Sequence, residues 1–143
     1  MKRHRALQPL SRDHHVALVA AQRLRRTGEG DIATARQAFL KFWHERGADH
    51  FRVEEDVLLP AASGWIDPEA DCIVRMLVDH IRIRAAAQRL EREAEPALDE
   101  LHHLGSALER HVRLEDREVF PLIEAAMPEP EAERLVELVL QRG

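Results

Sequence analysis

An internal repeat limits the folds open to this chain more than any other feature of its sequence. Residues 50–60 read H-F-R-V-E-E-D-V-L-L-P, and residues 111–121 read H-V-R-L-E-D-R-E-V-F-P. Each segment has a His, a Glu four residues later, a second acid five residues later and a Pro ten residues later. We interpret the segments as parts of two similar helix pairs that are related by a pseudo-two-fold axis.

Helix signals dominate the rest of the chain. Long stretches are rich in Ala, Leu, Arg and Glu, most of the Gly and Pro residues fall between them, and no segment alternates apolar and polar residues as a half-buried strand would. We therefore predict an all-α fold, an antiparallel up-down-up-down four-helix bundle with a short C-terminal fifth helix. The predicted helices run from the N-cap Ser11 to before Gly28, from Asp31 to about Leu59, from Asp67 to near Glu95, from about Ala97 to Met127, and from Glu131 to Gln141.

Length and composition predict one cytoplasmic domain. The 143 residues suit a single domain over 1–143, with an N-terminal tail at 1–10 and the short C-terminal helix at 131–143. A net charge of −5 argues against general nucleic-acid binding, and no apolar run approaches the roughly 20 residues of a membrane helix. The single cysteine, Cys72, excludes a disulfide framework and a cysteine-based metal cluster. We expect neither a nucleic-acid nor a membrane partner.

The repeat places two pairs of candidate metal ligands on helix faces. Residues i and i+4 of a helix lie within about 40° of each other around its axis. His50 with Glu54, and His111 with Glu115, can therefore each offer an imidazole nitrogen and a carboxylate to the bundle core. A His-x-x-x-Glu pair alone is a weak signal, so the repeat carries the specificity.

The two other long helices supply further histidines. His80 lies among apolar residues at helical spacing. The first helix has the adjacent His14 and His15, which point about 100° apart, so only one of them can face the core. Apolar neighbours select His14 and leave His15 at the rim, although the sequence does not close this choice.

Four imidazoles and two carboxylates aimed at one point form a site for first-row metals, and two bridging carboxylates hold a pair of ions. The alternative is a structural role, but burial of these groups without partners would cost several kcal/mol per charged group. We therefore predict a metal site. Glu118 lies seven residues after His111 and is either a further ligand or a surface acid, and Arg84 either pairs with a bridging Glu or reaches solvent.

The motifs resemble those of hemerythrin-like (HHE cation-binding) proteins over nearly the whole chain. H-F-x-x-E-E at 50–55 resembles the helix 2 motif of hemerythrins, His111 with Glu115 resembles the helix 4 motif, and Leu10-x-x-x-His14 resembles the start of helix 1. The resemblance implies a non-haem di-iron centre with an oxo or hydroxo bridge. Zinc can occupy such a site adventitiously, because it binds His and Glu at least as tightly as ferrous iron. The implied terminal ligands are His14, His50, His80 and His111, and the implied bridging ligands are Glu54 and Glu115.

Two departures separate this sequence from the oxygen carriers of that family. The carriers have two histidines four residues apart on helix 3, whereas Met76 and Arg84 stand four residues either side of His80. The carriers also have an Asp five residues after the helix 4 His; Asp116 stands there beside Glu115, which leaves open which acid bridges. The six-ligand set resembles a more divergent bacterial branch, and the lost imidazole leaves one iron with a freer coordination position.

We expect a di-iron protein that binds or senses a small ligand, namely oxygen, nitric oxide or iron itself. The alternative is a redox enzyme that consumes peroxide or reactive oxygen or nitrogen species, with His15, Glu118 or Arg84 as the acid-base group. The sequence does not choose between these two classes. The chain has no tyrosine, which excludes a tyrosyl radical.

Overall fold

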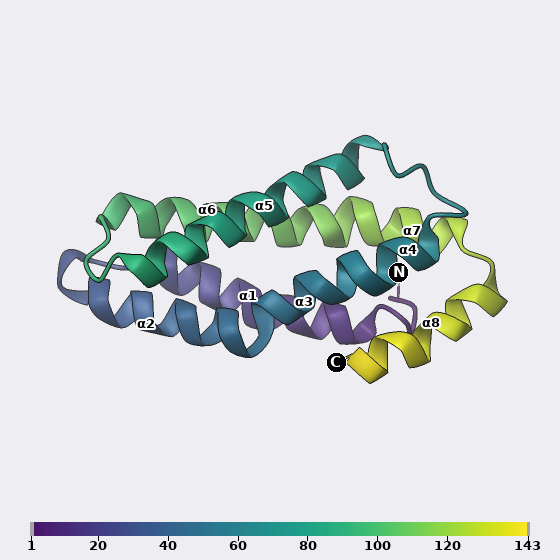
Figure 1. The fold of residues 1–143 in the computed structure, drawn as a ribbon, viewed down its shortest axis with the longest axis horizontal. Coiled ribbons are helices and arrows are strands. Elements are labelled where there is room, and N and C mark those ends of the chain that lie inside the picture. The colour runs from purple at the N-terminus through teal and green to yellow at the C-terminus, as the bar shows by residue number, and fades with distance from the viewer. Residues whose placement is uncertain (1, 143) are drawn as a thin grey trace.

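The computed structural model describes residues 2–142, and Met1 and Gly143, the outer ends of the predicted tail and C-terminal helix, lie outside the described residues. Within 2–142 the regular elements are all helical (Figure 1). In chain order they are α1 (Gln8–Arg25), the 3₁₀ turn η1 (Glu29–Asp31), α2 (Ile32–Phe42), the π-helical turn η2 (Trp43–Gly47), α3 (Ala48–Val53), the π-helical turn η3 (Glu54–Leu58), α4 (Leu59–Ala62), α5 (Asp71–Arg92), α6 (Leu98–Leu114), the π-helical turn η4 (Glu115–Val119), α7 (Phe120–Ala126) and α8 (Glu129–Arg142).

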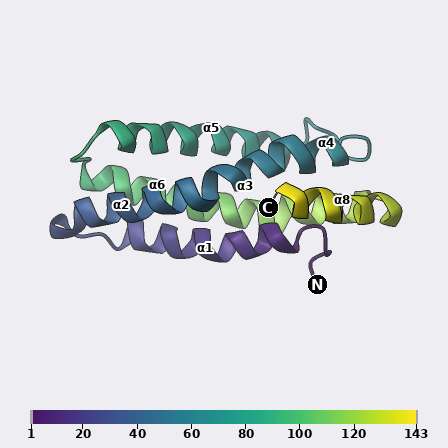
Figure 2. The ribbon, with the colours of Figure 1, turned by 60° about the horizontal axis from the view of Figure 1, so that its bottom comes forward.

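Five helical rods result, because π-helical turns join α2, α3 and α4 into one rod and α6 and α7 into another. Four rods lie side by side along the long axis, and the shorter α8 lies at the end of the bundle that also holds α4 and the N-terminal segment (Figures 1 and 2). The predicted all-helical bundle with a C-terminal fifth helix is confirmed. Among the described residues, no helix has the length and apolar character needed to cross a membrane.

Two predicted helix starts are wrong. Helix α1 begins at Gln8, and Ser11 lies inside its first turns, where its backbone N–H donates to Leu7 at 2.9 Å. Pro9 favours this earlier start, because proline in the first turn loses no intrahelical hydrogen bond. Helix α5 begins at Asp71, because the Asp67 side chain accepts the N–H of Glu69 at 2.9 Å and so stabilises a turn ahead of the helix.

The predicted end of the second helix at Leu59 is also wrong, since the helix continues through Pro60 to Ala62. Proline cannot donate a hydrogen bond, and its ring clashes with the carbonyl four residues back. The π-helical turn η3 directly precedes Pro60, and the N–H of Leu59 donates to the carbonyl of Glu54, five residues back. The widened turn is the local change by which the helix passes the proline.

The apolar core is divided into two clusters, one toward each end of the bundle. One cluster contains Leu10, Leu58, Met76, Val119 and Phe120, together with α8 residues such as Leu135. The other contains Leu24, Phe39, Ile83, Leu101 and Leu108. In each of the four long rods, the predicted ligands fall between residues of the first cluster and residues of the second. The fold therefore presents a polar layer across the middle of an apolar bundle.

Candidate metal centre

The six predicted ligands lie together in this middle layer, and all six are buried. We call them the central cluster: His14 on α1, His50 on α3, Glu54 at the start of η3, His80 on α5, His111 on α6 and Glu115 at the start of η4. The structure thus brings all six side chains to one place, and their role as ligands stays a prediction.

Glu115 spans the two halves of the central cluster. Its Oε1 lies 2.8 Å from Nε2 of His14, and its Oε2 lies 2.9 Å from Nε2 of His111. Its two oxygens therefore point toward different histidines, as the oxygens of a carboxylate that bridges two ions would.

Glu54 has the same arrangement. Its Oε2 lies 3.1 Å from Nε2 of His50, and its Oε1 lies 3.1 Å from Nε2 of His80. The donors form two overlapping groups, each with all its ligand atoms within 4.8 Å of one another. One group contains His14 and His50, the other contains His80 and His111, and both contain Glu54 and Glu115.

Several buried polar atoms of the central cluster lack a hydrogen bond. They are Nε2 of His50, Nε2 of His111 and both carboxylate oxygens of Glu54. Leaving buried polar atoms without partners costs free energy, and two bound cations, one in each ligand group, would satisfy all four of these atoms. The donor set and its unpaired atoms therefore fit a pair of metal ions.

Without metal, the histidines of this layer favour their protonated form. Burial opposes protonation of the histidines, but hydrogen bonds and charges of the nearby carboxylates outweigh it and raise the pKa of His14 and His80 to about 9 and that of His111 to about 10. Burial likewise opposes ionisation of Glu115, but the charge of His111 and the hydrogen bonds around it hold the pKa of Glu115 well below its usual range. Metal binding must displace these protons.

The second ring nitrogen of every cluster histidine bonds an outer carboxylate. These contacts are Nδ1 of His14 to Asp116 at 2.8 Å, Nδ1 of His50 to Asp13 at 3.0 Å, Nδ1 of His80 to Glu55, and Nδ1 of His111 to Asp79 at 3.1 Å. Two of the four acids, Glu55 and Asp116, are the second acids of the sequence repeat.

Sequence reasoning missed the other two outer acids, Asp13 and Asp79. Each directly precedes a cluster histidine, which is a signal that the sequence does contain. However, Asp49 precedes His50 in the same way and instead lies exposed against Arg52. The dipeptide alone therefore could not have identified them.

The structure shows different burial for the neighbouring residues that the sequence left as alternatives. His14 is buried and His15 is exposed, as the helix phase predicts. Glu115 is buried in the central cluster, whereas Asp116 is partly exposed and bonds only the outer nitrogen of His14. Glu118 lies at the surface and pairs with Arg75 at 2.7 Å.

Arg84 does pair with a glutamate, but with Glu55 rather than with either Glu of the central cluster. Its Nη1 donates to the two Glu55 oxygens at 3.0 and 2.8 Å. The guanidinium also lies 5.6 Å from the ring centre of Phe51.

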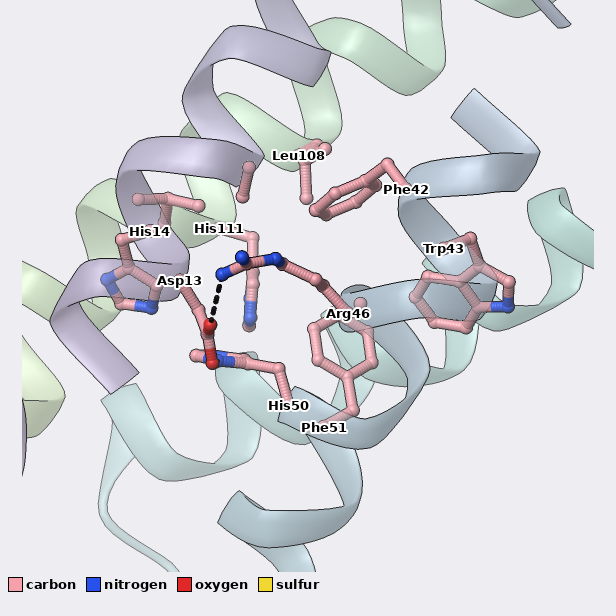
Figure 3. Close-up of a pocket in the computed structure, with 12 residues that line it drawn as sticks. Asp13, His14, Phe42, Trp43, Arg46, His50, Phe51, Leu108 and His111 are labelled. Carbon is pink, nitrogen blue, oxygen red and sulfur yellow. Dashed lines mark hydrogen bonds and ion pairs between the residues drawn. The ribbon is translucent and has the colours of Figure 1, made fainter. Parts of the chain in front are cut away.

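A small cavity of about 20 Å³ adjoins the central cluster (Figure 3). This is about the space that one water-sized molecule needs. Its lining comprises His14, His50 and His111, the apolar residues Ala17, Phe42, Trp43, Phe51, Leu108 and Val112, and Asp13, Arg46 and Gly47.

The cavity borders an open groove of about 610 Å³. Asp13, Arg46 and His50 line both spaces, and Arg46 reaches Asp13 at 3.5 Å (Figure 3). Arg46 is exposed, and such surface ion pairs contribute only about 0–1 kcal/mol. The Arg46 side chain, which this weak ion pair holds, therefore lies at the boundary between the groove and the cavity.

Comparison with known proteins agrees with the geometry of the centre. No curated protein and no solved structure gives a significant match to the chain. The model of the hemerythrin HHE cation-binding domain matches residues 5–123, which include the whole central cluster and exclude α8. With the buried His and Glu groups, this match indicates a metal-binding protein. The chain belongs to the hemerythrin HHE cation-binding domain family.

Proposed function

We propose that the central cluster holds two iron ions and that the protein binds a small diatomic ligand, oxygen or nitric oxide, in the adjoining cavity. The observation that carries the proposal is that Glu54 and Glu115 lie near two histidine pairs, directly beside a cavity of about 20 Å³. Binding of this kind would serve a sensor as well as a carrier.

The side chains of the protein would bind the ions, limit the access of ligands to them and exclude water from the cavity. His14 and His50 would hold one ion, His80 and His111 the other, and the two glutamates both. Bound iron would supply reversible electron transfer and a coordination position for the ligand. The mostly apolar wall of the cavity favours a small uncharged ligand over water.

The alternative of a peroxide-consuming enzyme receives less support. Acid-base catalysis in such an enzyme would fall to His15, Glu118 or Arg84. None of the three lines the cavity: His15 is exposed, Glu118 pairs with Arg75, and Arg84 pairs with Glu55. Ligand binding therefore fits the described residues better than peroxide turnover.

Iron loading followed by spectroscopy tests the proposal. After aerobic loading, elemental analysis should give about two irons per chain, and absorption spectra should change on addition of nitric oxide or oxygen. One metal ion or none per chain after loading would contradict the di-iron assignment. Zinc is measured as well, because it binds His and Glu at least as tightly as ferrous iron. Spectra that change with peroxide and not with either diatomic gas would favour the enzyme.

A cavity-filling variant tests where the ligand binds. Ala17→Val adds two methyl groups at the cavity wall and should weaken nitric oxide binding while leaving the iron content unchanged. Ala20→Val makes the same change on the same helix away from the cavity, and it should leave both properties as in the unsubstituted protein. Equal nitric oxide affinities in the two variants would place the ligand elsewhere.

A further inference from the structure

We infer that Asp13, Glu55, Asp79 and Asp116 are positioning residues, which fix the tautomer and orientation of the four cluster histidines so that Nε2 of each faces the metal. The inference rests on the metal site of the proposed function, but not on the identity of the metal or of the small ligand.

The tautomer follows from the chemistry of the partners. An ionised carboxylate only accepts hydrogen bonds, so an Nδ1 that bonds it must carry the hydrogen. A neutral imidazole with hydrogen on Nδ1 has its lone pair on Nε2. Nε2 is also the nitrogen that lies near Glu54 and Glu115 in all four histidines.

The four contacts form a closed ring around the bundle. Each of the four long rods provides one histidine to the central cluster and one acid to the histidine of the next rod. In order, the acid and histidine pairs are Asp13 of α1 with His50, Glu55 of η3 with His80, Asp79 of α5 with His111, and Asp116 of η4 with His14. All four neighbouring rod pairs are thereby tied together through a ligand.

The ring also follows the internal repeat. Asp13 and Asp79 each stand directly before a cluster histidine of their own rod, and Glu55 and Asp116 each stand five residues after one. The same positions thus hold the histidines in both halves of the molecule. A chance surface contact would not be expected to recur in this paired way.

Further contacts hold two of the acids. Arg84 binds both oxygens of Glu55, at 3.0 and 2.8 Å. Asp13 accepts a hydrogen bond from His50 at its Oδ2, and its Oδ1 lies 3.5 Å from Nη1 of Arg46. These acids are oriented before any metal arrives, which lowers the cost of ordering the site.

Zinc affinity tests the inference without any activity measurement. Asp13→Ala and Asp79→Ala should each weaken zinc binding by about 10- to 100-fold in competition with a chromophoric chelator. Asp13→Asn and Asp79→Asn keep an acceptor oxygen at nearly the same volume and should recover most of the affinity. Asp49→Ala is the matched control, because Asp49 also precedes a cluster histidine but lies exposed against Arg52.

Nitrogen NMR of the zinc-loaded protein gives the second readout. The imidazole shifts should show hydrogen on Nδ1 and metal on Nε2 for all four histidines. Metal on Nδ1 would overturn the inference, as would zinc affinities of folded Asp13→Ala and Asp79→Ala equal to that of Asp49→Ala. In the latter case the metal site itself would stand, whereas an unsubstituted protein that binds no zinc or iron would overturn the proposed function as well.

Discussion

Removal of metal should reverse the way in which the stability of the protein depends on pH. In the metal-free protein the pKa of His14 and His80 is about 9 and that of His111 about 10, against about 6.5 in an unfolded chain. A raised pKa contributes stability that is complete below the unfolded value and is lost as pH rises toward the folded value. The metal-free protein should therefore lose stability between about pH 7 and pH 9.

The size of the effect follows from the number of protons. A histidine that is protonated in the folded protein and neutral in the unfolded chain lowers the free energy of unfolding by about 1.4 kcal/mol per pH unit. The three histidines together give about 4 kcal/mol per pH unit, and His50, whose pKa is also raised, acts in the same direction. Since domains have about 5–15 kcal/mol of stability in total, two pH units should remove much of it.

The metal-loaded protein should behave differently, because metal replaces the protons and binds more tightly as pH rises. Urea unfolding at several pH values, with and without chelator, measures both slopes. His80→Gln should reduce the loss of unfolding free energy in the metal-free protein by about 1.4 kcal/mol per pH unit, the effect of one proton. His15→Gln, at an exposed position, should leave this loss unchanged. A metal-free protein whose stability is constant from about pH 7 to pH 9 would refute the reasoning, since the cluster histidines would then hold no extra protons.

Three further experiments, with five substitutions, test separate parts of the structure. His14→Ala should lower the metal content measured by elemental analysis, and His15→Ala should leave it unchanged. The reverse result would mean that His15, and not His14, faces the central cluster. Glu115→Ala and Glu54→Ala should each destabilise the metal-free protein at neutral pH in thermal melts, because His14 loses its acceptor in the first, and His50 and His80 lose a carboxylate at 3.1 Å in the second. Gly105→Ala should lower the unfolding free energy by about 1–3 kcal/mol with or without metal, because its Cβ would lie 2.7 Å from the carbonyl oxygen of Ala21.

The sequence predicted the type of fold better than the ends of its helices. Helix propensity and the apolar period extend over many residues, so the all-helical bundle did not depend on any one position. The ends depended on single residues whose effect is set by their surroundings. Ser11 and Pro60 are usual markers of helix ends, yet both lie inside helices, because Pro9 permits an earlier start and a π-helical turn carries the chain past Pro60.

The candidate site was predictable in its inner part. The repeat and the four-residue spacing predict four members of the central cluster, namely His50, Glu54, His111 and Glu115. Apolar neighbours favoured His80 and His14, the latter without closing the choice against His15, and the family resemblance implied all six. The outer acids depend on contacts between different rods, which no spacing within one helix contains. Asp13 bonds His50, 37 residues away in the chain, and Asp79 bonds His111, 32 residues away.

The pseudo-two-fold symmetry holds for the ligands but not for the side chains around them. The residue after the repeat histidine is Phe51 in one half and Val112 in the other. The Phe51 ring stacks on His80 with their centres 3.8 Å apart, and His80 does not line the cavity. His14 and His50 both do, and so does His111, the partner of His80 at the second position. The two proposed metal positions are therefore alike in their donors but differ in access: both histidines of the first position face the cavity, whereas at the second only His111 does, because Phe51 covers His80.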